Sequence, residues 1–408
     1  MISRTGSPLI TVVIPTRERA ETLEICLKTV VTQTYSNLRI IVSDNFSSDS
    51  TKDVVLGFDD KRITYLNTGR RLSMSHNWEF ALEKVSDGWV TVLGDDDGLL
   101  PGALETVAEI VRSTGTKALM SAACFYHWPS LTGNPHGQLT VPLGKGFEVR
   151  GGRVWLERLM SGKVDISHLP TLYTGGFICS SVINLIRQQS PNKQFYHSPI
   201  PDVYSAIAIS SVVDSFVFVR EPLAITGLSK NSIGVSVMSE ENGVRSPANS
   251  FYSETIIPFH SAIPMCPNGR IPSSVQAFKY ESYLQSTFLR ADMDSMPHAR
   301  QLSIILSQAG RLDLSISEWA KQFAALHGIS YSRAKRRSVF TNLLLRFGSI
   351  PRSVRNAFNL CSIDSPKLPI INVYEASIAV AAIRHYSLKR RFIRVLQLYA
   401  KLGKLFGL

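Results

Sequence analysis

The first hundred residues alternate short apolar runs with amphipathic stretches, a pattern that few folds accommodate. Residues 9–14 (LITVVI) and 38–42 (LRIIV) are almost continuously apolar, which is typical of strands buried on both faces of a sheet. Between them, residues 21–32 have the spacing of an amphipathic helix. Because strands that alternate with helices form parallel sheets, the sequence predicts an α/β fold with a mostly parallel sheet flanked by helices.

A cluster of polar residues follows every predicted strand of this region. The alternation continues with a helix over 51–57, a strand over 62–66, a helix over 75–85 and a strand over 89–93. The polar clusters occupy residues 15–19, 43–51, 67–71 and 95–97. Since ligands of open α/β sheets bind beyond the carboxyl ends of the strands, we expect these clusters to form one binding site.

The last cluster, Asp95, Asp96 and Asp97, places carboxylates side by side between two glycines. Adjacent carboxylates repel one another, and more strongly where water is excluded, so the arrangement gains most from a bound cation. The alternative is a negative N-terminus for a helix that begins near Pro101, but a single aspartate would suffice for that. The triplet favours Mg²⁺ or Mn²⁺, hard ions that one or two carboxylates hold together with substrate phosphates.

The turns after the first two strands carry further candidates. The first turn, PTRERAETL, lacks the GxGxxG of dinucleotide-binding folds. We expect Pro15, Thr16 and Arg17 to frame a nucleotide base and phosphate, the alternative being a helix start with solvated charges. In the second turn, SDNFSSDST, helix capping explains Ser50, whereas the Asp44 carboxylate can accept from a uracil N–H or a ribose hydroxyl.

Charge narrows the class of partner without selecting one. The 408 residues include 44 Lys+Arg and 32 Asp+Glu, a formal net charge of +12, which favours nucleic acid, nucleotide phosphates or an anionic membrane face. The 5 cysteines are widely spaced without a CxxC pair, so neither a disulfide framework nor a zinc site is expected. Apolar runs are too short for a signal or membrane-spanning segment, and we expect a cytoplasmic protein, soluble or peripheral at the inner membrane face.

The sequence pattern changes near residues 228–249, where we expect a domain boundary. We predict an α/β domain over 1–230, divided into halves of about 1–115 and 116–230, with residues 127–146 as a loop or hairpin. Residues 231–408 are predicted to be mainly helical, with helices over 273–290, 299–309, 316–327 and 331–347.

A basic amphipathic tail without acidic residues ends the chain over residues 376–408. Its apolar residues recur at spacings of three and four, as on one face of a helix: Leu388, Phe392, Val395, Tyr399, Leu402 and Phe406. This pattern is typical of a helix that lies on an anionic membrane surface, and packing of the apolar face on the α/β domain is an equal alternative.

Four segments in the first half of the chain carry a resemblance to a known family. TVVIPTRERAETL, IIVSDNFSSDST, residues 67–82 and VLGDDDGLLPGAL resemble, in order and spacing, the family 2 glycosyltransferases of the GT-A fold. The resemblance implies a nucleotide-sugar site in the first half of the α/β domain that includes Asp44, Asp95 and Asp96, with Mn²⁺ or Mg²⁺ held by Asp97. It also implies an acceptor site in the second half, and transfer with inversion at the anomeric carbon.

Two positions depart from the family's pattern. The Asp-x-Asp-Asp motif of the family here begins with Gly94, so the register of the aspartates stays open. The family's catalytic base usually lies in a Glu-Asp pair, whereas Pro201 precedes Asp202 in PIPDVYSAIAI. We assign Asp202 as the base that takes the proton of the acceptor hydroxyl, the alternative being an N-cap of a helix over 203–211.

The resemblance places two more loops near the substrates. Gly175 and Gly176 in TLYTGGFICSSVINLIR match the acceptor-binding loop, with a tight structural turn as the alternative. Lys230 in GLSKNSIGVS is the cation nearest to the loop that relatives place beside the diphosphate. Trp78, at the start of a predicted helix, is expected to pack in the core rather than to stack on a sugar.

Together these features predict an inverting, metal-dependent glycosyltransferase. It is expected to move a sugar from a nucleotide diphosphate donor, UDP-linked, to a glycan or lipid-linked acceptor in polysaccharide or glycolipid assembly. A nucleotidyltransferase of similar fold would carry a Gly-rich loop after the first strand, which PTRERAETL lacks. A basic scaffold that binds polyanions without catalysis has no need of the aspartates, and nucleic acid is not an expected partner.

Overall fold

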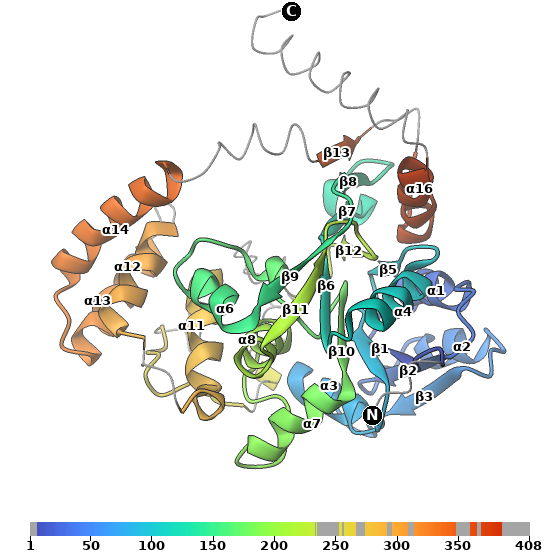
Figure 1. The fold of residues 1–408 in the computed structure, drawn as a ribbon, viewed down its shortest axis with the longest axis horizontal. Coiled ribbons are helices and arrows are strands. Elements are labelled where there is room, and N and C mark those ends of the chain that lie inside the picture. Colours follow the sequence, from blue (N-terminus) through green and yellow to red (C-terminus); the bar gives the residue numbers. More distant parts are fainter. Residues whose placement is uncertain are drawn as a thin grey trace, which may run out of the picture.

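The computed structural model describes residues 6–232, 234, 253–254, 257–266, 274–291, 296–308, 314–347, 360–364 and 369–385. Two sheets with their flanking helices form the larger part of the described chain (Figure 1). A group of helices from the C-terminal half packs to one side of them, at the left of the figure.

The first part of the larger sheet is parallel. Its strands β1 (Ile10–Thr16), β2 (Leu38–Asp44), β3 (Ile63–Asn67) and β4 (Trp89–Val92) lie in the order β3-β2-β1-β4. The connecting helices are α1 (Ala20–Val31), α2 (Thr51–Leu56) and α3 (Met74–Leu82). Every residue of β1 is buried, as its continuous apolar sequence requires. The predicted alternation of strands and helices is therefore confirmed.

Beyond β4 the same sheet becomes mixed. The strand β10 (Gly176–Cys179) runs antiparallel between β4 and β6 (Ala118–Ser121). Next come β11 (Ser215–Val219), parallel to β6, and the antiparallel edge strand β9 (Phe147–Gly151). The α/β class with flanking helices is confirmed, with parallel pairing in the first half and both kinds of pairing in the second.

A second sheet lies across the upper part of Figure 1. Its strands follow the order β13-β8-β7-β12-β5, and their bounds are β5 (Gly98–Leu99), β7 (Cys124–His127), β8 (Gln138–Pro142), β12 (Ala224–Leu228) and β13 (Leu360–Ile363). The antiparallel pair β7 and β8, with the short α5 (Pro129–Thr132) between them, is the hairpin expected over 127–146.

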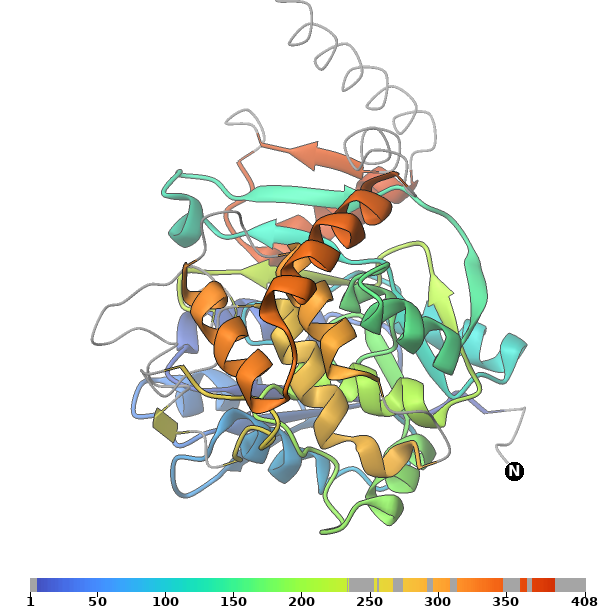
Figure 2. The same cartoon turned by 90° about the vertical axis from the view of Figure 1, so that its left-hand side faces the viewer.

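The helices of the C-terminal half form an apolar cluster separate from the main core. The helices that remain to be given are α4 (Ala103–Thr114), α6 (Gly152–Met160), η1 (Ile166–His168), α7 (Ser180–Gln189), α8 (Pro201–Val212), α11 (Val275–Gln285), η2 (Thr287–Leu289), α12 (His298–Gln308), α13 (Leu314–Leu326) and α14 (Tyr331–Phe347). Apolar residues of α6 and α8 share one cluster with those of α11, α12 and α13, and Figure 2 faces this group. The four helices predicted between 273 and 347 are confirmed.

Residues after the predicted boundary at 230 return to the α/β part. The strand β13 pairs with β8, and α16 (Val373–His385) packs on α1, β5 and β12. Val373, Ala376 and Val380 are fully buried there, so the start of the predicted basic tail belongs to the core. The amphipathic pattern from Leu388 onward lies outside the described residues.

None of the helices in the described ranges combines the length and the apolar character needed to cross a bilayer.

Candidate functional site

The three aspartates lie where the carboxyl ends of β1 and β4 meet. Thr16 at the end of β1 donates from Oγ1 to Asp95 Oδ2 over 2.8 Å, and Arg19 forms a 2.9 Å ion pair with Asp95 Oδ1. Burial works to lower the pKa of Arg19, but the charges of Asp95 and Asp96 outweigh it and raise that pKa. Part of the positive charge that the triplet requires thus comes from Arg19, which sequence reasoning passed over in favour of Arg17 in the same turn.

The loop after β12 folds onto the second aspartate. Ser229 and Ser232 donate to Asp96 Oδ2 over 2.7 and 2.6 Å. Arg19 also donates to the main-chain oxygen of Asn231 in this loop. Lys230 is exposed between these residues, so the structure brings its loop to the aspartates, as the resemblance implied.

Asp97 is fully buried, and both of its carboxylate oxygens accept hydrogen bonds. Oδ2 accepts from the Gly94 N–H (2.9 Å) and the Thr174 hydroxyl, and Oδ1 accepts from the Gly227 N–H (2.7 Å). Burial and the charge of Asp96 raise the pKa of Asp97 to about 7. These contacts point away from the predicted role of Asp97 as the metal ligand, because its oxygens already join three separate segments.

Helix capping does not account for the triplet. The following helix α4 begins at Ala103 with Gly102 as its N-cap, and no side chain caps it.

The departure at Gly94 has a steric reason. A Cβ at this position would lie 2.7 Å from Asp97 Oδ2 and 2.8 Å from the hydroxyl of Tyr173. Tyr173 stacks on Trp78, with ring centroids 5.4 Å apart, and the buried Trp78 packs as expected. Burial and the charges of Asp97, Asp96 and Asp202 raise the pKa of Tyr173 far above its ordinary value, so its hydroxyl keeps its proton.

Gly94→Ala is expected to lower the free energy of unfolding by about 1–3 kcal/mol, because the methyl group must displace a buried carboxylate or phenol. Urea unfolding followed by circular dichroism measures this change. Gly6→Ala is the matched control, since nothing lies within 4 Å of a Cβ there. Equal stability of both variants with the wild type would show that the site adapts without cost.

Asp44 is buried at the end of β2 and is held by its neighbours. Its Oδ1 accepts from the Ser47 N–H over 2.9 Å, and its Oδ2 accepts from the Tyr65 hydroxyl (2.5 Å) and the Asn67 amide (3.1 Å). The structure therefore places the Asp44 carboxylate at the site edge with its oxygens already hydrogen-bonded. A base or ribose contact at this position has to compete with Tyr65 and Asn67.

The capping interpretation of Ser50 is wrong. Ser50 is the N-cap residue of α2, but its side chain forms no capping bond. Asp49 takes the role instead: Oδ1 accepts from the Thr51 N–H (3.1 Å) and Oδ2 accepts from the Ala20 N–H (3.0 Å). One carboxylate thereby binds the starts of two helices, which a serine hydroxyl is too short to do.

The first turn contributes a second, half-buried cation in addition to Arg19. Pro15 and Thr16 are buried within β1, while Arg17 lies beyond it and forms an ion pair with Glu254. Arg71 shares this carboxylate over 3.5 Å. Two cations from the first half of the chain thus share one acidic side chain from the C-terminal half.

Asp202 lies in the first turn of α8, which begins at Pro201 with Ile200 as N-cap. The N-cap alternative is therefore wrong. Burial raises the pKa of Asp202, and within the described chain no side chain hydrogen-bonds to its carboxylate. Its charge and those of the three aspartates are among the causes of the raised pKa of Tyr173, so Asp202 and the triplet both lie near the Tyr173 hydroxyl.

The two glycines of the predicted acceptor loop form a tight turn between these groups. Gly175 has φ +87°, and a Cβ on Gly176 would lie 1.8 Å from the Thr171 carbonyl oxygen. Thr171 also donates from Oγ1 to the main-chain oxygen of Asp202 over 3.0 Å. The turn therefore holds Thr171 against the main chain of Asp202 and Thr174 against the Asp97 carboxylate, with Tyr173 between them in sequence.

The segment before Asp202 is anchored from two sides, which sequence reasoning missed. Glu79 of α3 accepts from the N–H groups of Phe195 (2.9 Å) and Tyr196 (3.0 Å). Ser198 donates from Oγ to Glu281 of α11 over 2.5 Å. Both carboxylates are buried, and their partners are distant in sequence.

Comparison with known proteins decides the family. Residues 11–155 match the model described as "Glycosyl transferase family 2". This part of the chain is a family 2 glycosyltransferase domain. The matched range contains Asp44 and all three aspartates, and Asp202 lies beyond it.

The family 2 domain is similar to two bacterial glucosyltransferases. It is 43% identical over 105 residues to the GalNAc(5)-diNAcBac-PP-undecaprenol β-1,3-glucosyltransferase of Campylobacter jejuni, covering 25% of this chain and 34% of the relative. It is 30% identical over 97 residues to the UDP-Glc:α-D-GlcNAc-diphosphoundecaprenol β-1,3-glucosyltransferase WfgD of Escherichia coli, covering 24% and 38%. The matched segment thus spans little more than a third of either relative.

A solved structure, residues 1–349 of S. aureus TarS in complex with UDP-GlcNAc, aligns with a TM-score of 0.42 and 10% identity. The alignment covers 84% of this chain and 93% of that chain. A score this low supports no inference by itself.

The family 2 domain can hold a divalent ion only if a substrate supplies some of the coordinating oxygens. In the described part of the chain no group of three or more His, Cys, Asp or Glu side chains could hold a metal. Asp95 is paired with Arg19 and Asp97 is enclosed, which leaves Asp96, whose contacts are two hydroxyls on Oδ2. One carboxylate among hard oxygen donors fits Mn²⁺ or Mg²⁺ that completes its shell with donor phosphates.

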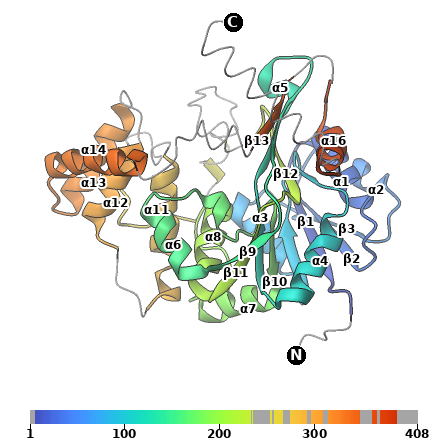
Figure 3. The same ribbon diagram turned by 45° about the horizontal axis from the view of Figure 1, so that its top comes forward.

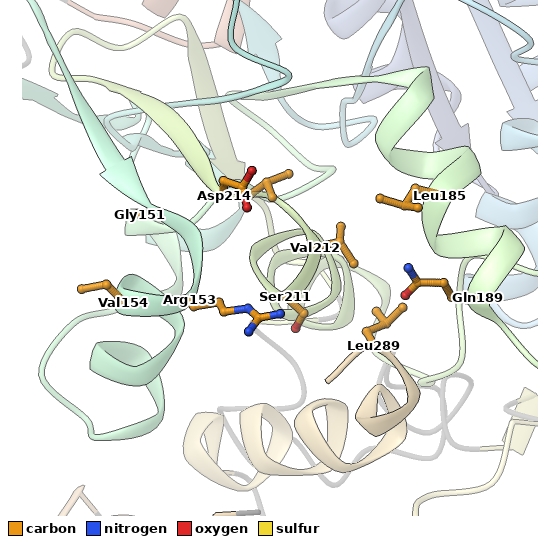
Figure 4. Close-up of a pocket in the computed structure, with 10 residues that line it drawn as sticks. Gly151, Arg153, Val154, Leu185, Gln189, Ser211, Val212, Asp214 and Leu289 are labelled. Carbon is orange, nitrogen blue, oxygen red and sulfur yellow. The ribbon is translucent and has the colours of Figure 1, made fainter. Parts of the chain in front are cut away.

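A separate hollow of about 290 Å³ lies at the opposite end of α8 from Asp202 (Figure 4). Val212, Leu185 and Leu289 line it together with the exposed Arg153 and Asp214. Since Ser211, which lines the hollow, follows Asp202 by nine residues along α8, about 14 Å of helix separates the two. It is not part of the site of the family 2 domain.

Proposed function

We propose that this protein is an inverting glycosyltransferase that moves a sugar from a UDP-linked donor to a hydroxyl of a glycan or lipid-linked saccharide. The observation that carries the proposal is the segment 171–174, which contacts both Asp202 and the aspartates at the strand ends: Thr171 donates to the main-chain oxygen of Asp202, and Thr174 donates to the Asp97 carboxylate. The names of both relatives support the acceptor class, because each acts on a saccharide linked through diphosphate to undecaprenol.

The donor is proposed to bind at the ends of β1, β2 and β4. Asp44 lies at the position for the base or ribose, and Arg17 with Lys230 supplies positive charge for the diphosphate. Asp96 would hold Mn²⁺ or Mg²⁺, which neutralises the charge that develops on the departing nucleoside diphosphate. Arg19 holds Asp95 in place beside this group through their ion pair.

Transfer is proposed to proceed as a single displacement. The acceptor oxygen forms a bond to the anomeric carbon while the bond from that carbon to the donor phosphate oxygen breaks, which inverts the configuration. Asp202 takes the proton of the attacking hydroxyl. Its partial burial and its freedom from side-chain partners suit a base, because the carboxylate is available to substrate and its raised pKa makes it a stronger proton acceptor.

The proposed location is the cytoplasm, with peripheral contact to the inner membrane face through the part of the basic tail of residues 376–408 that follows α16. That contact would bring the enzyme to a lipid-linked acceptor.

The test is release of UDP and transfer of sugar by the purified protein. With Mn²⁺ and a panel of nucleotide sugars, a UDP-sugar should be consumed faster when a diphosphate-linked saccharide is added. Release of pyrophosphate from a nucleoside triphosphate supplied with a sugar phosphate would instead identify a nucleotidyltransferase. Absence of turnover with every donor, alongside salt-sensitive binding of polyanions, would favour a scaffold.

A further inference from the structure

The helix α14 presents a basic and apolar face to solvent at the outer end of the helical group (Figures 1 and 3). We propose that this face docks on a bilayer surface that contains anionic phospholipid. The proposal concerns a segment different from the predicted tail, and it does not depend on the proposed reaction.

The inner face of α14 fixes which side chains point outward. Ala334 and Ser338 are buried against the neighbouring helices, and Asn342 donates from Nδ2 to the Ser307 carbonyl of α12 over 3.0 Å. These residues are spaced by four, so they form one stripe along the helix. The opposite side of α14 therefore faces away from the protein.

Large apolar side chains occupy that outer side. Val339, Phe340 and Leu343 are 68%, 61% and 50% exposed. Leu326, at the end of α13 before the turn into α14, is 56% exposed. Scattered exposed apolar residues are ordinary, but a group of this size within two turns of one helix marks a surface that contacts something apolar.

The charge around these side chains selects the partner. Four exposed basic residues precede the apolar group along α14: Arg333, Lys335, Arg336 and Arg337. Neither α14 nor the adjacent α12 contains an acidic residue. An anionic bilayer offers both phosphate charge and an apolar interior to such a face, whereas duplex nucleic acid has no apolar interior into which Phe340 and Leu343 can insert together.

Leu56 on α2 gives a contrast within the same chain. It is 59% exposed, but the charges near it in sequence balance, with Asp53, Asp59 and Asp60 against Lys52, Lys61 and Arg62. An isolated exposed leucine without a basic excess around it lacks the charge that attracts an anionic membrane. This makes Leu56 a matched control for the apolar residues of α14.

The test is sedimentation of the full chain with vesicles of phosphatidylcholine alone or with one third phosphatidylglycerol. The wild type should bind only the anionic vesicles, and added salt should release it. Binding should fall about tenfold or more in two variants, the charge variant Arg333→Gln/Arg336→Gln/Arg337→Gln and the apolar variant Phe340→Ser/Leu343→Ser. Leu56→Ser should bind as the wild type does, and UDP release by all three variants should be unchanged.

Three results would overturn the proposal. The wild type could fail to bind anionic vesicles. Both α14 variants could bind as tightly as the wild type, which would assign binding to another segment such as the tail. Gel filtration could show a dimer that Phe340→Ser/Leu343→Ser dissociates, in which case a second copy covers the face. If the wild type released no UDP, that result would count against the proposed reaction. The vesicle experiment would still test the proposal for α14.

Discussion

Asp202→Asn is expected to lower the rate of sugar transfer by about 10²- to 10⁴-fold while donor affinity hardly changes. The amide cannot take a proton from the acceptor hydroxyl, but it has nearly the same size and stays in the first turn of α8. Donor contacts are unaffected because the proposed donor residues come from β1, β2, β4 and the loop after β12. The measurement is kcat for transfer beside the Kd of the UDP-sugar in the same variant.

The control is Asp214→Asn, which changes an exposed carboxylate beyond the other end of α8. It should transfer sugar at the wild-type rate. If Asp202→Asn also retains a rate within a few-fold of the wild type, Asp202 is not the base, and Asp165 is the next carboxylate to test.

The pH dependence of transfer should report the same group. Burial raises the pKa of Asp202, and a base acts only when deprotonated. Activity should therefore fall as the pH is lowered, with a midpoint above the ordinary range of an aspartate. The kcat/KM profile of the wild type measures this midpoint, and an acid limb in the ordinary aspartate range would contradict the assignment.

Asp96→Asn and Asp97→Asn are expected to change different properties, metal-dependent donor binding and stability, although the residues are adjacent. Asp96→Asn should abolish the dependence of donor binding on Mn²⁺ and leave the melting temperature near that of the wild type. The hydroxyls of Ser229 and Ser232 can rotate to suit an amide, so folding loses little.

Asp97→Asn should instead lower the free energy of unfolding by about 1–3 kcal/mol. Main-chain N–H groups of Gly94 and Gly227 face its two different oxygens, so either orientation of the amide buries an NH₂ against a donor that cannot turn away. Calorimetric titration with UDP and Mn²⁺, together with urea unfolding, separates the two effects. A stable Asp97→Asn protein that has lost its metal response would restore Asp97 as the ligand.

The elements of the first hundred residues were predictable because their signals are local. The continuous apolar run of β1 and the amphipathic spacing of α1 report burial on two faces and on one face. The position of the polar clusters followed as well, since parallel strands share one carboxyl edge. The C-terminal helices were found by the same periodicity, whereas β13 is a four-residue strand whose partner β8 is more than two hundred residues away.

The roles of individual site residues were less predictable, because they depend on distant partners. Ser50 has a sequence typical of a cap, yet Asp49 reaches the N-termini of both α1 and α2. Tyr173 carries no motif, and its position near both Asp202 and the aspartates depends on the turn at Gly175. Arg19 and Arg17 lie in the same turn, but Arg19 pairs with Asp95 and Arg17 pairs with Glu254.

By itself, the sequence determined the α/β class, the edge at which the site forms and the family of the first 155 residues, because periodicity and short motifs are properties of neighbouring residues. Only the tertiary structure decided which partners each of the three aspartates has, and therefore which role each can take. Arg19 neutralises Asp95, hydroxyls surround Asp96, and main-chain N–H groups enclose Asp97. These partners come from different strands and loops, and identical neighbouring carboxylates become distinct only when the fold gives each its own surroundings.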